Sequence, residues 1–344
     1  MRMPLLHLVV LSALSVLACP AHAEIAIGGF APAISFFGAN AQGEATPSGQ
    51  ISGDLTVLTE PIFGVYEPHE RVIYVSDFNG QALRVYPAFA RGNVPPLRML
   101  NPPAIGQARA NAPVFAHDEI GLIVFNCCIA TYPLHANGDA VPALRTIGWG
   151  GASGSQTDLD NPTSLRYLPD TDEYVVSEYN RIVFHARTDG HYDPPTRRIT
   201  GAAVANTISL AHDPASHRLY LLQQAPWDGS SPTRHGRIAV FADDASGDAT
   251  PLYTIEGPTT GLDLPPEQHL YGIGHDPWLH RLMVSSSPNT GSFTANRLVT
   301  FSDTASGDAT PLQILVGTNT GSSYLGTPFA VPADVIFANA FEHP

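Results

Sequence analysis

ASGDATPL stands at residues 245–252 and again, letter for letter, at residues 305–312. The likeness extends on both sides, to RIAVFADDASGDATPLYTIEG at 237–257 and RLVTFSDTASGDATPLQILVG at 297–317. Four weaker copies of the same frame lie at 34–53, 83–100, 130–148 and 181–201. An identical octapeptide inside a similar longer frame is not an effect of composition, so the chain is built from a repeat.

Each copy predicts two strands joined by a tight turn. The first strand is rich in β-branched and aromatic residues, as in Ile238, Val240 and Phe241. The turn contains a glycine, which adopts the positive φ that a tight reversal needs. A proline then opens the second strand, and because proline lacks an N–H donor, that strand belongs at the outer edge of its sheet. The turn glycines are Gly43, Gly92, Gly138, Gly190, Gly247 and Gly307.

These glycines recur at intervals of roughly 50 residues, which suits one four-stranded blade of a β-propeller. Two further apolar stretches precede the later copies, as at 210–212 and 219–221, and complete four strands per unit. The sequence therefore predicts an all-β, six-bladed β-propeller with four strands in each blade. An open array of units and two stacked sandwiches are the alternatives.

The two chain ends are predicted to share one blade. The N-terminal part contains only the last two strands of a unit, near 34–37 and 48–51. The C-terminal part contains only the first two, near 329–331 and 335–337. Strands from both ends would then close the ring, which protects the sheet edges from pairing with other chains.

The composition excludes two classes of partner. The chain has 344 residues and a formal net charge of −14, and its 17 basic residues are all arginine. An acidic surface repels nucleic acid, since phosphate neutralisation needs clustered cations, and it repels anionic membrane surfaces. Hydrophobic residues make up 44% of the chain, which is enough to bury a core and argues against disorder.

The first residues predict an exported protein. Residues 1–23 combine a positive start, an apolar run and the motif Ala21-His22-Ala23, the pattern of a cleavable signal peptide. A lipoprotein with a lipidated Cys19 is the alternative, and no later stretch approaches the ~20 apolar residues of a transmembrane segment. The expected destination is the periplasm or the extracellular space. The expected organisation is a signal peptide at 1–23, a single β-propeller domain at 24–340 and a short tail at 341–344.

The repeat frame resembles a known family. The order I-x-V-F, turn, Gly-Asp or Gly-Asn, Pro-Leu and apolar strand is similar to bacterial NHL-type and related six-bladed propeller repeats, as is the turn His212-Asp213-Pro214. The resemblance covers about residues 30–340. Such propellers serve as scaffolds, lyases, lactonases, sugar dehydrogenases and cell-surface components, so the fold does not define an activity. The ending at 334–342 also looks like one found on exported proteobacterial proteins, with Ala340 where glycine is usual.

Three histidines are candidate ligands of a divalent metal. His117, His212 and His275 each precede an aspartate at the end of an expected inner strand. In a propeller such positions converge on one mouth of the central channel, where three neutral imidazoles could bind zinc or another divalent ion. The alternative is a turn in which the aspartate bonds to nearby backbone and the histidine fills a half-exposed slot.

Cys127 and Cys128 are the only cysteines that remain after the expected cleavage. Export would place them in an oxidising compartment. A vicinal disulfide between them, two free thiols and intermolecular bridges all stay open.

The sequence predicts a binding or scaffold protein whose partner is an unknown protein or small-molecule ligand. The long loops at 223–235 and 285–296 are expected to set specificity. One alternative is a hydrolase or lyase at the channel mouth, assisted by a metal on the three histidines. The other is a structural component of the cell envelope.

Overall fold

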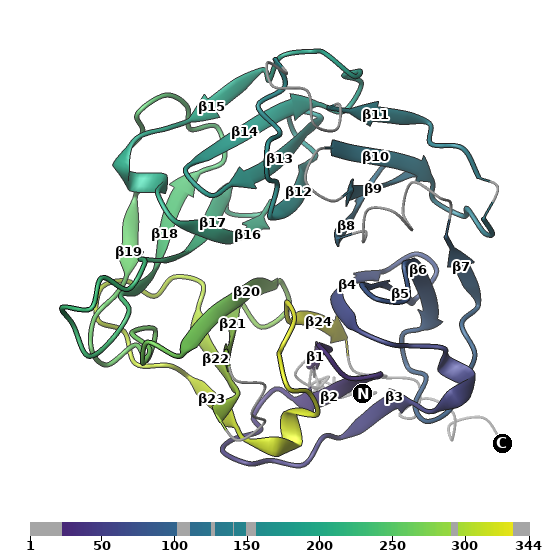
Figure 1. Cartoon of the computed structure of the whole chain (residues 1–344), viewed down its shortest axis with the longest axis horizontal. Coiled ribbons are helices and arrows are strands. Elements are labelled where there is room, and N and C mark those ends of the chain that lie inside the picture. Colours follow the sequence, from purple (N-terminus) through teal and green to yellow (C-terminus); the bar gives the residue numbers. More distant parts are fainter. Residues whose placement is uncertain are drawn as a thin grey trace, which may run out of the picture.

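The computed structural model describes residues 23–101, 111–124, 128–139, 141–148, 156–289 and 295–332. Within these ranges the chain forms six four-stranded antiparallel sheets that stand around a central axis (Figure 1). The inner strands of neighbouring sheets contact each other all the way round, so the ring is closed. The predicted all-β, six-bladed β-propeller is confirmed.

Every blade has an inner strand, two middle strands and an outer strand. Blade 1 contains β4 (Pro61–Glu67), β5 (Val72–Asp77), β6 (Ala82–Pro87) and β7 (Arg98–Leu100); blade 2 contains β8 (Asn111–Ala116), β9 (Glu119–Val124), β10 (Cys128–Pro133) and β11 (Arg145–Ile147). Blade 3 contains β12 (Ser164–Leu168), β13 (Glu173–Glu178), β14 (Arg181–Ala186) and β15 (Arg197–Ile199); blade 4 contains β16 (Thr207–Asp213), β17 (Arg218–Gln224), β18 (Gly236–Ala242) and β19 (Tyr253–Ile255). Blade 5 contains β20 (Gln268–Asp276), β21 (Arg281–Pro288), β22 (Arg297–Ser302) and β23 (Gln313–Val316); blade 6 contains β24 (Phe329–Pro332), β1 (Ala23–Ile27), β2 (Ala33–Gly38) and β3 (Gly49–Ser52).

Helix is almost absent from the described ranges. The short 3-10 turns η1 (Asp54–Thr56), η2 (Ala202–Val204) and η4 (Thr318–Thr320) each follow an outer strand. No helix in the described part of the chain has the length and apolar character needed to cross a membrane.

The middle strands are buried on both faces because each blade packs between two neighbours. All residues of β5, β9 and β13 are buried. The core therefore lies between blades rather than inside one layer. Between blades 4 and 5, for example, Tyr220 and Val240 pack in one cluster with Ile273 and Leu282. This explains why the middle strands read as nearly continuous apolar runs.

The repeated glycine turn bonds five of the six blades to the preceding blade. Gly247, in the turn after β18, forms a parallel bridge with Ile199 of β15 in blade 3. Its N–H donates to the carbonyl of Arg198 (2.7 Å), and its carbonyl accepts the N–H of Thr200 (2.8 Å). The same bridge joins Gly307 to Ile255, so the identical octapeptides make identical contacts. The other bridges of this kind are Gly43 to Leu315, Gly92 to Ile51 and Gly138 to Leu100.

Gly190 does not occupy the position predicted for it. Leu252 donates its N–H to Val240, and in blade 3 the matching donor is Thr196, which bonds to Phe184. Gly247 lies five residues before Leu252, and the residue five before Thr196 is His191. His191, not Gly190, is therefore equivalent to Gly247. Gly190 and His191 both lack a positive φ, whereas φ at Gly247 is 68°. The turn has the same length, and the glycine stands one residue early.

The ring is closed by one C-terminal strand and three N-terminal strands, not by two and two. β24 pairs with β1, with Ile25 opposite Ala330, and β1 pairs with β2 (Figure 1). The sequence prediction missed β1 because it directly follows the leader-like segment. The expected strand at 335–337 lies outside the described residues, and blade 6 is complete without it. Sharing of one blade by both ends is confirmed, but its division between them was predicted wrongly.

Candidate functional site at the mouth of the central channel

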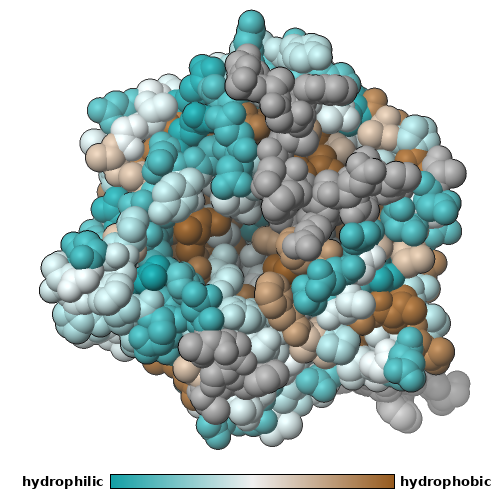
Figure 2. Space-filling model, viewed as in Figure 1, coloured by the Kyte–Doolittle hydropathy of each residue, from teal (hydrophilic) through white to brown (hydrophobic). Residues whose placement is uncertain are grey.

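A cavity of about 250 Å³ lies in the central channel. Its walls come from the inner strands of all six blades and from the residues just before β24. The face of the molecule drawn in Figure 2 is hollowed at the centre of the ring, with hydrophobic residues beside the hollow. The lining residues are Phe63, Gly64, Val65, Pro113, Val114, Phe115, Arg166, Tyr167, Ala211, His212, Gly274, His275, Thr327, Pro328 and Phe329.

Arg166 extends from β12 into this cavity. Its Nη1 donates to the carbonyl of Leu165 (2.6 Å) and lies 3.4 Å from the hydroxyl of Ser164. Its Nη2 donates to the carbonyl of Ile273 in β20 (3.3 Å). Because Arg166 belongs to blade 3 and Ile273 to blade 5, the side chain reaches past blade 4 within the channel. No carboxylate of the described residues pairs with this guanidinium.

The charge of the cavity wall is opposite to that of the whole chain. The sequence has 31 Asp and Glu residues, yet none of the described lining residues is acidic. The same lining includes Arg166, His212 and His275. Cationic and protonatable groups therefore gather in the channel of a protein whose formal net charge is −14.

An aspartate of its own blade holds each cavity histidine. His212 Nε2 lies 3.0 Å from Asp243 Oδ2, and His275 Nε2 lies 3.2 Å from Asp303 Oδ2. Asp243 directly follows β18, and Asp303 directly follows β22, so the two pairs occupy equivalent positions in blades 4 and 5. Burial lowers the pKa of His212, although Asp243 opposes this shift.

The same aspartates also face a second, exposed histidine. His217 Nδ1 lies 3.4 Å from Asp243 Oδ2, and His280 Nδ1 lies 3.3 Å from Asp303 Oδ2. Both histidines end the turn between the inner strand and the first middle strand, with φ near 54° and 52°. Blades 4 and 5 thus carry the same His–Asp–His arrangement, which the sequence analysis did not identify. The signal was present, since both blades read His-Asp-Pro-x-x-His.

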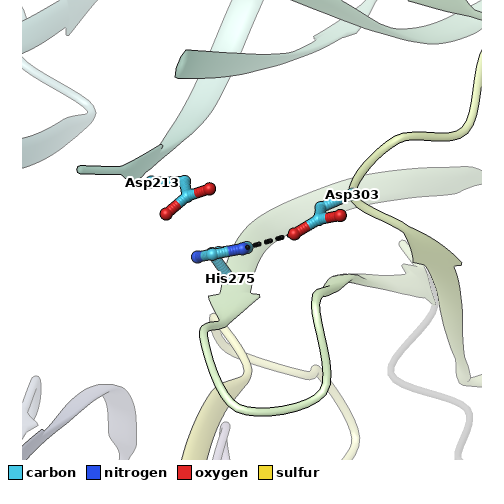
Figure 3. A group of neighbouring side chains, drawn as sticks. All are labelled: Asp213, His275 and Asp303. Atoms are coloured by element: carbon cyan, nitrogen blue, oxygen red, sulfur yellow. Dashed lines mark hydrogen bonds and ion pairs between the residues drawn. The ribbon is translucent and has the colours of Figure 1, made fainter. Parts of the chain in front are cut away.

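Asp213, His275 and Asp303 form a cluster that could hold a metal ion. One ligand atom from each lies within 4.8 Å of the others. Figure 3 shows the ring of His275 between the two carboxylates. Burial opposes ionisation of Asp213, but a hydrogen bond from Ser216 and the nearby His275 lower its pKa overall. Two carboxylates and an imidazole suit a divalent ion. This set shares only His275 with the predicted ligands, and a bound metal stays a prediction.

His117 lies away from His212 and His275. It stands in the two-residue turn between β8 and β9 with φ 57°, and its side chain is 59% exposed. Its Nε2 lies 3.5 Å from Asp172 Oδ1. The turn of blade 2 is shorter than that of blade 4, so the string Ala-His-Asp falls at a different place in the register. Phe115, which pairs with Ile120, occupies the position of His212.

The turn interpretation of the His-Asp-Pro string is confirmed for its aspartates. The N–H of Ala215 donates to Asp213 Oδ1 (3.1 Å), and the N–H of Trp278 donates to Asp276 Oδ1 (2.9 Å). These carboxylates satisfy backbone donors that the turn would otherwise leave free. Burial raises the pKa of Asp276, although its hydrogen bonds oppose this.

The long loop of blade 4 lies away from this turn. Residues 225–235 join β17 to β18, whereas the Asp213 turn joins β16 to β17. Successive hairpins of an antiparallel sheet lie at opposite ends, so the expected specificity loop is at the other end of the blade from His212. Residues 290–294 of the second expected loop lie outside the described residues.

Cys128 begins β10 and is disulfide-bonded. Cys127, the partner in the predicted vicinal disulfide, lies outside the described residues, so that pairing stays a prediction.

Comparisons with known proteins identify no family for this chain. No family model matches the chain, and no curated protein matches it. Among solved structures, Kuenenia stuttgartiensis hydrazine synthase is similar at 11% identity and TM-score 0.47, over 73% of this chain and 64% of that one. A chain of the mitotic checkpoint complex is similar at 13% identity and TM-score 0.46, over 73% and 63%. This chain spans less than two thirds of either match, and likenesses at this level carry no functional argument.

Proposed function

We propose that this protein is an exported binding protein that takes a small ligand into the cavity at the centre of its propeller. The propeller fold by itself suggests a binding or scaffold role. The cavity is the observation that carries the proposal, because all six inner strands line it and its walls are mostly apolar with a few polar groups. Small-molecule sites are built in this way. The volume of about 250 Å³ suits a small metabolite rather than a peptide.

Two features support export. Cleavage between Ala23 and Glu24 would remove only the first residue of β1, which leaves the ring complete. Cys128 is disulfide-bonded, and disulfides persist mainly in oxidising compartments. Intact-mass measurement of the protein from cell fractions tests this part. A periplasmic or secreted species that begins at Glu24 is expected, a lipidated species that begins at Cys19 would show the lipoprotein alternative, and a cytoplasmic chain with residues 1–23 attached would contradict export.

A plugged cavity tests the binding proposal. Val65 lines the cavity, is partly exposed and also packs on the core between blades 1 and 2, so Val65→Trp is designed to fill the cavity with an indole. Leu312→Trp is the matched control, because Leu312 is 52% exposed and does not line the cavity. Fragments of small acids, amides and amines are screened against both variants and the wild type by thermal shift, since a ligand that binds only the folded state raises the Tm.

We expect at least one fragment to stabilise the wild type and Leu312→Trp but not Val65→Trp. Fragments that stabilise all three proteins equally would place the binding site outside the cavity and contradict the proposal.

A further inference from the structure

We infer that the ligand of the central cavity is a small carboxylate with an apolar body, held by the guanidinium of Arg166. This inference rests on the proposed function and names the chemical class of its ligand. It depends on three observations: the bonding of Arg166, the charge of the cavity wall and the apolar character of the remaining lining.

The guanidinium of Arg166 has partners but no counter-charge. Arginine offers five N–H donors, and the acceptors that Arg166 contacts are the carbonyls of Leu165 and Ile273 and the hydroxyl of Ser164. These acceptors are neutral, so they orient the group without balancing its charge. Buried Arg84, by contrast, is balanced by Asp77 at 2.7 Å. Arg297 is desolvated and bonds a carbonyl, as Arg166 does, but only Arg166 lines the cavity. Its unbalanced charge therefore lies where a ligand would enter.

Its surroundings make the missing charge costly. The residue keeps some surface open to the cavity, yet its guanidinium lies deep in the channel, and desolvation lowers the pKa of Arg166 to about 10. The other titratable groups that line the cavity are Tyr167, His212 and His275, and the positive charge of Arg166 contributes to the lowered pKa of His212. Asp243 and Asp303 are already paired with His212 and His275. A bound anion would supply the compensation that the described residues do not.

The rest of the wall selects the body of the ligand. Phe63, Phe115 and Phe329 line the cavity together with Val114 and two prolines, Pro113 and Pro328. These surfaces favour an aromatic or aliphatic group over a strongly hydrated ion. Arginine recognises a carboxylate through two parallel N–H bonds, so one end of the ligand is fixed while the other is buried among the rings.

Isothermal titration of the full chain with three phenyl probes of similar size tests the inference. Benzoate carries the charge, benzamide is neutral, and benzylamine carries the opposite charge. We expect benzoate to bind at least ~10-fold more tightly than benzamide, as a charge-assisted hydrogen bond would give, and benzylamine not to bind. Sulfate is the fourth probe, and it is expected to bind more weakly than benzoate because it cannot use the apolar wall.

Arg166→Met tests the residue itself, with Arg297→Met as the matched control. Arg297 is also desolvated and also bonds a carbonyl, that of Gly261, but it does not line the cavity. We expect Arg166→Met to lose benzoate binding at least ~10-fold while its Tm stays equal to or above that of the wild type, because an unbalanced buried cation is removed. Arg297→Met is expected to keep wild-type benzoate affinity. The comparison of probes on the wild type remains decisive if a variant does not fold.

Three results would overturn the inference: benzamide binding as tightly as benzoate, sulfate binding as tightly as benzoate, or Arg166→Met keeping full benzoate affinity. If benzamide bound equally well and Val65→Trp abolished its binding, the cavity would still be a ligand site and the proposed function would stand. If no probe or fragment bound in a manner sensitive to Val65→Trp, both would fail.

Discussion

A guanidinium that leaves water without a counter-charge costs free energy, and Arg166 is in that position. Its neighbours in the sequence, Leu165 and Tyr167, are ordinary strand residues, so nothing local distinguishes it from a surface arginine. Only the closed ring places it inside a channel. For this reason the sequence could predict the inner strand but not the role of the residue in it.

The buried carboxyl of Glu178 should make the stability of the protein depend on pH. It is 6% exposed, one carboxylate oxygen has no partner, and burial raises its pKa to about 7. Since the folded pKa lies above the unfolded value near 4.5, the stabilising contribution is complete below about pH 4.5 and is lost as the pH rises through 7. Glu178→Gln should abolish this loss, which is worth about 3 kcal/mol.

Urea unfolding of the wild type and Glu178→Gln between pH 5 and pH 8 measures the difference. Glu267→Gln is the control, because Glu267 is exposed. Equal pH dependence in the wild type and Glu178→Gln would show that Glu178 does not titrate with the raised pKa.

The histidines also show where residue-level reasoning succeeds and fails. The Asp-Pro turn was predictable, because a carboxylate that accepts backbone N–H bonds is a local property of the string. His117 shares the string Ala-His-Asp with His212 but not its register. Register depends on turn length across the hairpin, and a short string does not contain it.

The positive φ of the glycine turns should make them sensitive to substitution by alanine. At Gly247 the φ of 68° strains any side chain, although a Cβ there would meet no atom within 4 Å. Gly247→Ala should therefore lower the free energy of unfolding by about 1 kcal/mol through backbone strain alone.

Gly190→Ala is the matched control for this turn. Gly190 has no positive φ, and a Cβ would lie 3.6 Å from Asp193 Oδ2, an ordinary contact. Its effect should stay within about 0.5 kcal/mol. Chemical denaturation of both variants measures the two free energies of unfolding. Equal losses of stability would mean that the two glycines have the same role in their turns. The sequence suggested that Gly190 and Gly247 are equivalent, because a glycine one residue out of register looks the same in a degenerate repeat.

Closure of the ring by β24 should be needed for the stability of the whole molecule. A chain that ends at Pro332 keeps β24, whereas a chain that ends at Gly326 loses it and exposes the edge of β1. Loss of buried Phe329 and Val331 should cost at least about 3 kcal/mol, and the free edge should promote self-association. Size-exclusion chromatography and thermal unfolding of the two truncated chains and the full chain make the comparison.

The chain that ends at Pro332 should behave like the full-length protein. If it were as unstable as the chain that ends at Gly326, a strand near 335–337 would be needed, as the sequence first indicated. The number of blades was predictable because the repeat occurs six times. The division of the last blade was not, because β1 is short and directly follows an apolar leader-like segment.

Crystals of the full chain soaked with 4-bromobenzoate, recorded at the bromine absorption edge, would locate the ligand within the molecule directly. An anomalous peak inside the ring is expected, with the carboxylate against the guanidinium of Arg166 and the bromophenyl ring among Phe63, Phe115 and Phe329. A ligand that occupies only the outer surface of the blades, while the channel stays free of it, would contradict a binding site built from the six inner strands.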